Sequence, residues 1–314
     1  MKHKLYLDLY SFTFNEKGIK GNALSNNDFL SKAYPSAAGN KFSEGFAQEI
    51  INLLDKKLYK NKEGTRGAIL EDKFLRAENR IFDILINGGT TGLKQYIINQ
   101  EGNQEEINEK DVVGLKFYAR FWLPSGSETG FLFVQKYGGI SIKPIFDSII
   151  NDIIEPLNLR KSAAKLKATT TKKRMKEFLK HSNIKDVTII GESSNHSTGG
   201  LNSSAAEIRL KGIKSVKELS KKEILRKANK DLDSYGFSIA DRDYKVKAKF
   251  EYKINKETTQ ERTIYLGVED DYHIVPNILI GLSLVNTDNS PKFKELGLFV
   301  DKEIEQLKKE AKVK

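Results

Sequence analysis

Residues 244–254 alternate strictly between apolar and charged side chains, and this pattern constrains the fold more than any other in the chain. Because the side chains of a β-strand repeat every two residues, the alternation predicts a strand with one apolar face and one charged face. The charged positions are Lys245, Lys247, Lys249, Glu251 and Lys253. The segment 262–266 follows after a short polar stretch, which predicts that the two strands form a hairpin.

The remainder of the chain mixes strand and helix patterns without a steady alternation of the two. Strand patterns occupy 5–14, 115–123, 131–136, 140–143, 165–169, 184–190 and 207–211. Helical patterns occupy 43–58, 145–157, 172–181, 221–235 and most of 292–314. Two further strand patterns, 80–87 and 93–99, flank the glycine-rich segment 88–92, which predicts a second hairpin. We therefore expect an α+β fold of two domains, with mixed, largely antiparallel sheets and flanking helices.

The net charge divides the chain into two parts. Basic and acidic residues are equal in number in residues 1–158, so the whole formal net charge of +11 lies in 159–314. Within 159–182 the only acidic residue is Glu177. This asymmetry predicts a neutral α+β domain at 1–158. It also predicts a basic α+β domain at 159–314 that ends in a charged helix and can meet a polyanion.

Composition narrows the possible chemistry. The absence of cysteine excludes disulfides and thiolate zinc sites, and it agrees with a reducing cytoplasm. The four histidines are scattered, no Walker A sequence or nucleophile elbow is present, and the longest apolar stretch, 274–285, is too short to span a bilayer. We expect a cytoplasmic, non-catalytic protein that needs no cofactor.

Three basic segments are the candidate DNA-binding surfaces: 160–180, the outer face of the helix at 221–235, and the lysine row of the strand at 244–254. Their lysines and arginines would contact phosphates, so that binding would be electrostatic and independent of sequence. The candidate residues are Arg160, Lys161, Lys172, Lys173, Arg174, Lys176, Lys221, Lys222, Arg226, Lys245, Lys247 and Lys249.

Two alternatives stay open. Glu251-Tyr-Lys253, with Asp241 and Asp243 upstream, has the spacing of a class of Mg²⁺-dependent nucleases, in which carboxylates hold the metal and the lysine assists the attacking water. The other alternative is a module that recognises a phage or host protein and carries an incidentally basic surface.

The segment 130–190 carries a family resemblance. It contains Gly130-Phe-Leu-Phe-Val134, Gly138-Gly-Ile-Ser-Ile-Lys-Pro-Ile-Phe146, an isoleucine-rich helix, Leu166-Lys-Ala-Thr-Thr170, a basic helix and Ile184-Lys-Asp-Val-Thr-Ile189. This order resembles the RexA-like and KwaB-like phage-exclusion proteins. The resemblance implies a DNA-binding protein of bacterial antiviral defence and abortive infection, which acts as sensor or effector. It further implies a homodimer with a membrane-protein partner encoded alongside. The apolar helix at 145–157 offers a second reason to expect a dimer.

Overall fold

The computed structural model describes residues 4–18, 23–55, 57–92, 94–108, 110–162, 164–171, 173–174, 182–191, 206–211, 244–255, 258–266 and 278–311. The chain forms two compact units. Unit 1 comprises Met1–Ala168 and Asn277–Lys314, and unit 2 comprises Thr169–Pro276. The fold is α+β, and every strand pairing in the described segments is antiparallel.

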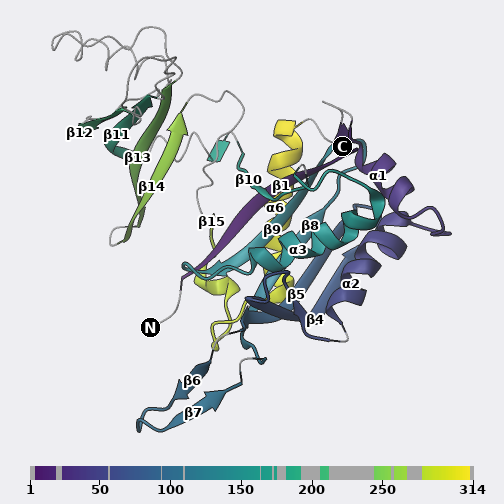
Figure 1. The fold of residues 1–314 in the computed structure, drawn as a ribbon, viewed down its shortest axis with the longest axis horizontal. Helices are drawn as coiled ribbons and strands as arrows, with labels where there is room; N and C mark the ends of the chain where they lie inside the picture. Colours follow the sequence, from purple (N-terminus) through teal and green to yellow (C-terminus); the bar gives the residue numbers. More distant parts are fainter. Residues whose placement is uncertain are drawn as a thin grey trace, which may run out of the picture. The chain divides into compact units, whose positions relative to one another are not determined.

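Unit 1 is built on a nine-stranded sheet with the order β10-β1-β9-β8-β5-β4-β3, and β2 and β15 also pair with β1 (Figure 1). Its strands are β1 (Leu5–Asn15), β2 (Ala23–Leu24), β3 (Tyr59–Lys60), β4 (Arg66–Arg76), β5 (Ile81–Thr90), β8 (Val113–Trp122), β9 (Thr129–Tyr137), β10 (Lys167–Ala168) and β15 (Ile278–Leu279). A separate hairpin joins β6 (Gln95–Ile98) to β7 (Gln104–Ile107). The central strands are buried on both faces because helices cover each side of the sheet.

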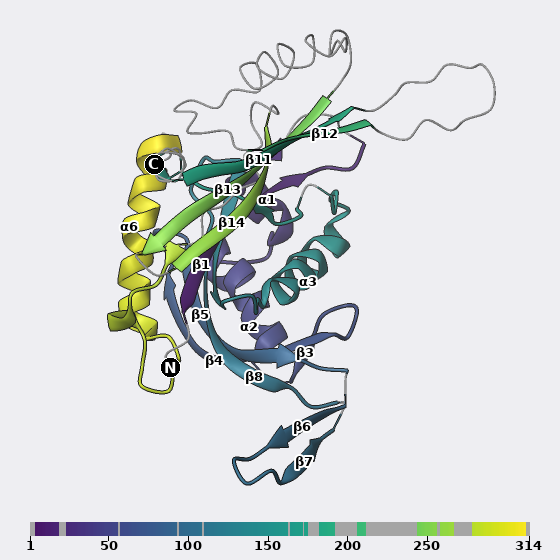
Figure 2. The same cartoon turned by 90° about the vertical axis from the view of Figure 1, so that its left-hand side faces the viewer.

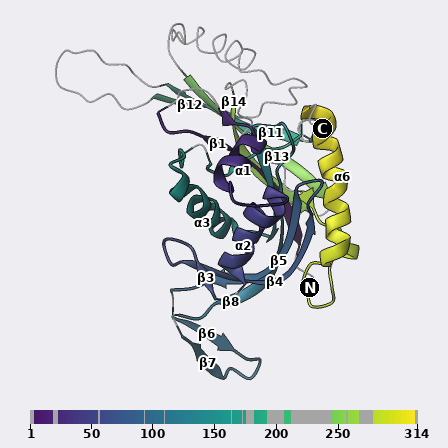
Figure 3. The same ribbon diagram turned by 90° about the vertical axis from the view of Figure 1, so that its right-hand side faces the viewer.

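Figures 2 and 3 show the sheet of unit 1 between α6 on one side and α1, α2 and α3 on the other. The bounds are α1 (Asn26–Ala33), α2 (Gln48–Leu54), α3 (Lys143–Ile154) and α6 (Phe293–Ala311). Short helical turns are η1 (Lys41–Ala47, a π-helix), η2 (Glu155–Leu157) and η3 (Leu282–Leu284). The predicted helix at 43–58 corresponds to η1 and α2, with Asn40 as the cap in front of η1.

The predicted apolar helix is α3, and its apolar side chains form part of the core. Ile145, Phe146 and Ile149 are fully buried, and Ile153 is 2% exposed. Pro144 lies in the first turn of this helix, where its missing N–H costs nothing. Because the apolar face is covered within unit 1, α3 no longer supports the expectation of a dimer.

The C-terminal helix α6 belongs to unit 1, where it packs against β8. Leu296, Val300 and Ile304 on its inner face are buried. The predicted charged terminal helix is therefore present. The bounds of the two units nevertheless differ from those of the domains expected from the sequence, 1–158 and 159–314, because residues 277–314 belong to unit 1.

In sequence, unit 2 is inserted between β10 and β15, two short strands that pair with the same side of β1. Strand β10 pairs Ala168 with Tyr10, and β15 pairs Ile278 with Leu7. Both strands run antiparallel to β1, so the chain leaves the sheet opposite Tyr10 and rejoins it opposite Leu7, continuing in the same direction. Only Asp8 and Leu9 of β1 lie between the two pairings.

Unit 2 contains a four-stranded sheet with the order β12-β11-β13-β14. The strands are β11 (Ser182–Gly191), β12 (Ala206–Lys211), β13 (Tyr244–Asn255) and β14 (Thr258–Leu266). The predicted strand at 244–254 and its hairpin with 262–266 are confirmed. The predicted helix at 221–235 and most of that at 172–181 lie outside the described residues.

The hairpin predicted around residues 88–92 is wrong. Strand β5 continues through Gly88 and Gly89 and pairs with β4 and β8, whereas the strand after it pairs with β7. A Cβ atom on Gly89 would lie 1.9 Å from the carbonyl oxygen of Val113. These glycines therefore permit close approach of neighbouring strands and do not form a turn. Residues 140–143 likewise form no strand, since only a single bridge joins Ile140 to Tyr137 before α3 begins.

Candidate nucleic-acid interface

The register of the sheet in unit 2 places basic residues of two strands on one face. Directly opposed residues of antiparallel strands lie on the same face, so each row across the sheet can be followed from β12 to β14. The rows are Lys211–Asp186–Lys249–Thr263, Arg209–Thr188–Lys247–Tyr265, and Glu207–Ile190–Lys245. We call these positions the basic face. The opposite face has apolar rows such as Leu210–Val187–Ala248–Ile264, and Val187 is fully buried.

Acidic residues are interleaved with the basic ones on this face. Asp186 lies between Lys211 and Lys249 in its row, and Glu207 occupies the row of Lys245. In these three rows the basic residues outnumber the acidic ones, so the face keeps a net positive charge. The density of positive charge on this face is lower than the lysine row of β13 alone indicates. Thr188 on this face is 9% exposed, and Lys249 is half-buried.

Two of the predicted DNA-binding residues lie in unit 1. Lys161 Nζ lies 2.7 Å from Glu155 Oε1, and this hydrogen bond and charge lower the pKa of the Glu155 carboxyl. The Arg160 backbone N–H donates to the Asn15 carbonyl at 2.8 Å, next to a bridge between Glu16 and Leu159. These contacts give Lys161 a neutralising partner and tie the Arg160 backbone to the end of β1.

The other predicted residues belong to unit 2. Lys173 is exposed and Arg174 is half-buried, and the Arg174 backbone N–H donates to Thr171 Oγ1 at 3.1 Å. Lys172, Lys176, Lys221, Lys222 and Arg226 lie outside the described residues. The structure therefore brings Lys245, Lys247 and Lys249 together on β13, and it assigns Arg160 and Lys161 to a different unit.

The residues of the nuclease alternative are only partly described. Glu251 and Lys253 lie on β13, where Glu251 is opposed by Asn183 on one side and Glu261 on the other. Asp241 and Asp243 lie outside the described segments. In the part of the chain that the structure describes, no group of three acidic, histidine or cysteine residues is arranged to hold a metal ion.

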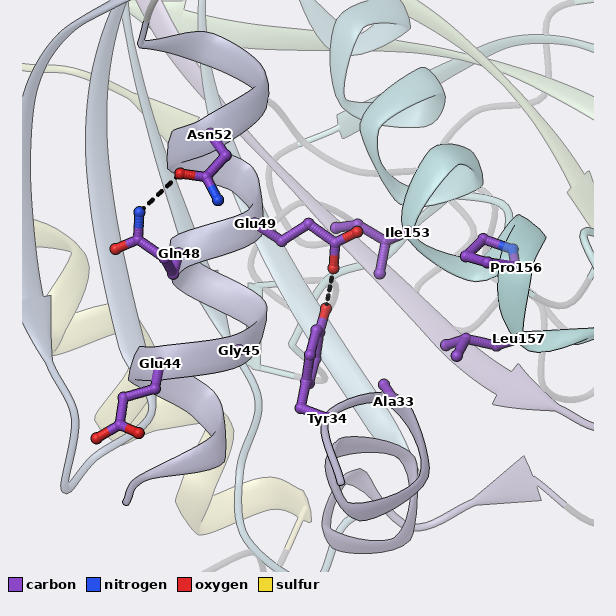
Figure 4. Close-up of a pocket in the computed structure, with 10 residues that line it drawn as sticks. All are labelled: Ala33, Tyr34, Glu44, Gly45, Gln48, Glu49, Asn52, Ile153, Pro156 and Leu157. Carbon is purple, nitrogen blue, oxygen red and sulfur yellow. Dashed lines mark hydrogen bonds between the residues drawn. The ribbon is translucent and has the colours of Figure 1, made fainter. Parts of the chain in front are cut away.

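A pocket of about 360 Å³ lies between α1, the η1–α2 helix and the end of α3 in unit 1 (Figure 4). Ala33, Ile153, Pro156 and Leu157 form its apolar wall, and Glu44, Gly45, Gln48, Glu49 and Asn52 come from η1 and α2. The Tyr34 hydroxyl donates to Glu49 Oε2 at 2.5 Å, and Gln48 Nε2 donates to Asn52 Oδ1 at 2.8 Å. Burial and the Glu49 carboxylate raise the pKa of Tyr34, so its hydroxyl stays protonated. The side chains of Tyr34, Glu49, Gln48 and Asn52 are thus paired within the pocket, and Glu44 Oε2 accepts from the Gly39 backbone N–H at 2.9 Å. These polar groups serve the packing of the helices.

A second hollow, of about 700 Å³, opens beside the start of β1 and the end of β9. Tyr6 and Tyr137 are buried beside it, and Leu115 and Ile140 expose apolar surface. The Tyr137 hydroxyl donates to the Lys116 carbonyl at 2.8 Å, and burial raises the pKa of Tyr137 to about 12. The Lys116 ammonium pairs with Glu71. Lys4 and Asp288 also line the hollow, which therefore combines an apolar wall with charged groups of both signs.

The charged cluster between the sheet and α6 was not anticipated from sequence. Arg120 on β8 is fully buried, with Nε 2.5 Å from Asp83 Oδ1, Nη1 2.5 Å from Asp301 Oδ1 and Nη2 2.9 Å from the Gly297 carbonyl. Tyr118 also donates to Asp83. The available signal was a single charge in each of two apolar strand patterns, 81–86 and 117–122. Such a charge requires a buried partner.

Comparison with known proteins gives no further guide to the site: no family model, no curated protein and no solved structure matches the chain. In the described segments, no helix is long and apolar enough to cross a membrane.

Proposed function

We propose that the chain binds DNA without sequence preference through the basic face of unit 2. The observation that supports this proposal most directly is the register of β12, β11 and β13, which aligns Arg209 with Lys247 and Lys211 with Lys249. Cations on β12 and β13, which are separated in the sheet by β11, can meet several phosphates, and each contact releases counterions. The role of these residues is electrostatic.

Salt-dependent DNA binding tests the proposal. Fluorescence anisotropy with a labelled duplex of arbitrary sequence gives Kd between about 50 and 200 mM salt, over which several phosphate contacts weaken affinity steeply. The triple substitution Lys245→Glu, Lys247→Glu and Lys249→Glu is expected to abolish binding at 150 mM salt. At lower salt it should reduce the slope of log K against log salt by roughly two to three units.

A matched control distinguishes the effect of a local binding surface on affinity from the effect of net charge. Lys294, Lys302 and Lys309 are exposed on α6 in unit 1, and their replacement by glutamate changes the net charge by the same amount. This control is expected to change affinity little. Equal losses in both variants contradict a localised face. Absence of binding at 50 mM salt contradicts the proposal and favours recognition of a protein.

The resemblance to RexA-like and KwaB-like proteins extends the proposal to antiviral defence in the cytoplasm, with phage DNA as the polyanion and a membrane protein as a partner. Plating of phage on cells that carry the natural gene cluster tests this extension. The β13 triple variant is expected to lose protection, and the α6 triple variant is expected to keep it. Protection by both variants contradicts a defence role for DNA binding.

A further inference from the structure

The hollow of about 700 Å³ beside the start of β1, which we call the β1 hollow, has the size of a small-molecule site. Segments distant in sequence enclose it: the start of β1, the start of β8, the end of β9 with the turn that follows, and the loop 288–290 before α6. In the described part of the chain its lining residues all belong to unit 1. The site can therefore be considered within unit 1 alone.

One wall of the β1 hollow is apolar and open to solvent. Ile140 is 52% exposed and Leu115 is 38% exposed, although both are large aliphatic side chains. Tyr6 and Tyr137 are buried in the same lining, and the Tyr137 hydroxyl already donates to the Lys116 carbonyl. Apolar surface in a concave site is removed from water when an apolar molecule binds. This wall therefore favours a ligand with an apolar body.

The loop before α6 forms the polar wall, and its own hydrogen bonds stabilise it. The Asn286 N–H donates to the Ser290 carbonyl at 2.8 Å, and the Asn289 N–H donates to the Asn286 carbonyl at 3.1 Å. Asp288 Oδ1 accepts from the Ser290 N–H at 2.9 Å and from the Ser290 hydroxyl at 2.6 Å. Asn289 has a φ of 65°, a left-handed conformation that asparagine tolerates better than most residues. The loop thus presents Asp288 and Asn289 from an ordered backbone.

The hydrogen-bonding capacity that this wall leaves unused belongs to acceptors. Asn289 Oδ1 is a buried atom with no hydrogen-bond partner among the described residues. A buried acceptor without a donor is costly, and a ligand N–H that reaches it removes this cost. Hydrogen bonds from the Ser290 hydroxyl and N–H, and to a smaller extent the charge of Lys116, lower the pKa of Asp288. This exposed carboxylate is therefore ionised at neutral pH, beside an amide oxygen that lacks a donor.

The cations of the lining have partners within the protein. The Lys116 ammonium pairs with Glu71, and Lys4 also interacts with other groups of the chain. We propose that the β1 hollow binds a small organic ammonium ion, whose apolar body packs against Leu115 and Ile140 and whose ammonium group donates to Asp288 and to Asn289 Oδ1. This site lies in unit 1, so it is independent of DNA binding by unit 2.

Three probes with one phenylpropyl body and different charges test the class of ligand. They are 3-phenylpropylammonium, 3-phenylpropan-1-ol and 3-phenylpropionate, each titrated against the full chain at pH 7 by ligand-observed NMR. The ammonium ion is expected to bind at least tenfold more tightly than the alcohol, and the propionate is expected to bind most weakly. Equal affinities for the ammonium ion and the alcohol, or tightest binding of the propionate, overturn the proposed class. Absence of binding by all three up to about 20 mM overturns the site.

Substitutions in the loop locate the ammonium group. Asp288→Asn keeps an oxygen that can accept from Ser290 but removes the charge, so the affinity for 3-phenylpropylammonium should fall at least tenfold while that for the alcohol stays unchanged. Asn289→Gly removes the amide at a backbone conformation that glycine adopts readily, and it should weaken the ammonium complex several-fold. Asp55→Asn, the matched control, removes an exposed carboxylate of unit 1 outside the hollow and should change neither affinity. Ammonium affinity that survives either loop substitution, or that falls equally in the control, overturns the assignment.

The variant Ile140→Ala tests the apolar wall. Because this side chain is half exposed, its truncation leaves the core of unit 1 intact. It is expected to weaken binding of 3-phenylpropylammonium and of 3-phenylpropan-1-ol by the same factor, since the two probes share their apolar body. If neither affinity changes, the body of the ligand does not lie against this wall, and the placement in the β1 hollow is wrong.

Discussion

The Arg120 guanidinium makes two hydrogen bonds to the Asp83 carboxylate, with Nε 2.5 Å from Oδ1 and Nη2 3.0 Å from Oδ2. The two residues lie on β8 and β5, and both are almost completely buried. Arg120 also contacts the Gly297 carbonyl and Asp301 of α6. One buried cation therefore joins the centre of the sheet to a helix that is distant in sequence.

Removal of this cation should be strongly destabilising. Arg120→Met leaves the Asp83 carboxylate buried without its main partner, and such a loss costs about 3–5 kcal/mol. Urea unfolding followed by circular dichroism measures the effect. Lys161→Met, which removes a pair between exposed side chains, is the control and should leave the unfolding midpoint unchanged. A loss below about 1 kcal/mol for Arg120→Met would mean that Asp83 finds another partner.

The ion pairs that Asp301 makes with two arginines predict that the stability of the fold depends on pH. Burial by itself would raise the pKa of Asp301, but the hydrogen bond from Arg76 and the charge of Arg120 outweigh burial and hold this pKa below its usual value. A carboxyl with a lowered pKa in the folded state adds stability above its unfolded pKa of about 4, and this stability is lost as pH falls through the folded value. The stability difference between the natural chain and Asp301→Asn should thus be constant from pH 7 to pH 5 and shrink below about pH 4. Urea titrations at several pH values measure it, and a difference that does not shrink as pH falls below about 4 contradicts this assignment.

A glycine in the π-helix η1 predicts a steric effect. A Cβ atom on Gly45 would lie 2.3 Å from Cγ of Tyr34, whose hydroxyl is held by Glu49. Gly45→Ala must therefore displace the tyrosine ring or the helix, at a cost of about 1–3 kcal/mol. Gly139→Ala is the matched control, because nothing lies within 4 Å of its added Cβ. Thermal unfolding of both variants checks the difference, and equal melting temperatures would contradict it.

Local periodicity predicted much of the secondary structure. The alternation at 244–254 and the helical spacing at 145–157 depend only on which face of an element is apolar, so a single sequence contains the information. Strand partners depend on residues distant in sequence. The glycines at 88–89 fit a turn by composition, whereas they permit β8 to approach β5 closely.

The distribution of charge along the sequence was a weaker guide to the candidate site. The positive charge of 159–314 is divided between the units because residues 159–168, with four basic residues and no acidic one, belong to unit 1. Lys161 is neutralised by Glu155, which precedes the charge boundary in sequence. On the basic face, Asp186 is aligned with Lys249 only through the bulged register of β11, which no local pattern reveals. Charge predicts that a segment is basic, but pairing decides which charges share a surface.

The insertion of unit 2 predicts that unit 1 folds without it. Ala168 pairs with Tyr10 and Ile278 with Leu7, so two residues opposite Leu9 and Asp8 would join β10 and β15 into one strand. A variant in which residue 168 is linked to residue 278 through two residues, such as Thr-Val, should unfold cooperatively with a melting temperature close to that of unit 1 in the full chain. A one-residue linker is the control. It shifts the register and would place the side chains of β15 on the wrong faces, which should lower the melting temperature by several degrees. If the two-residue variant is unfolded, unit 1 depends on unit 2. If it folds and still binds DNA as tightly as the full chain, the basic face of unit 2 is not the DNA-binding surface.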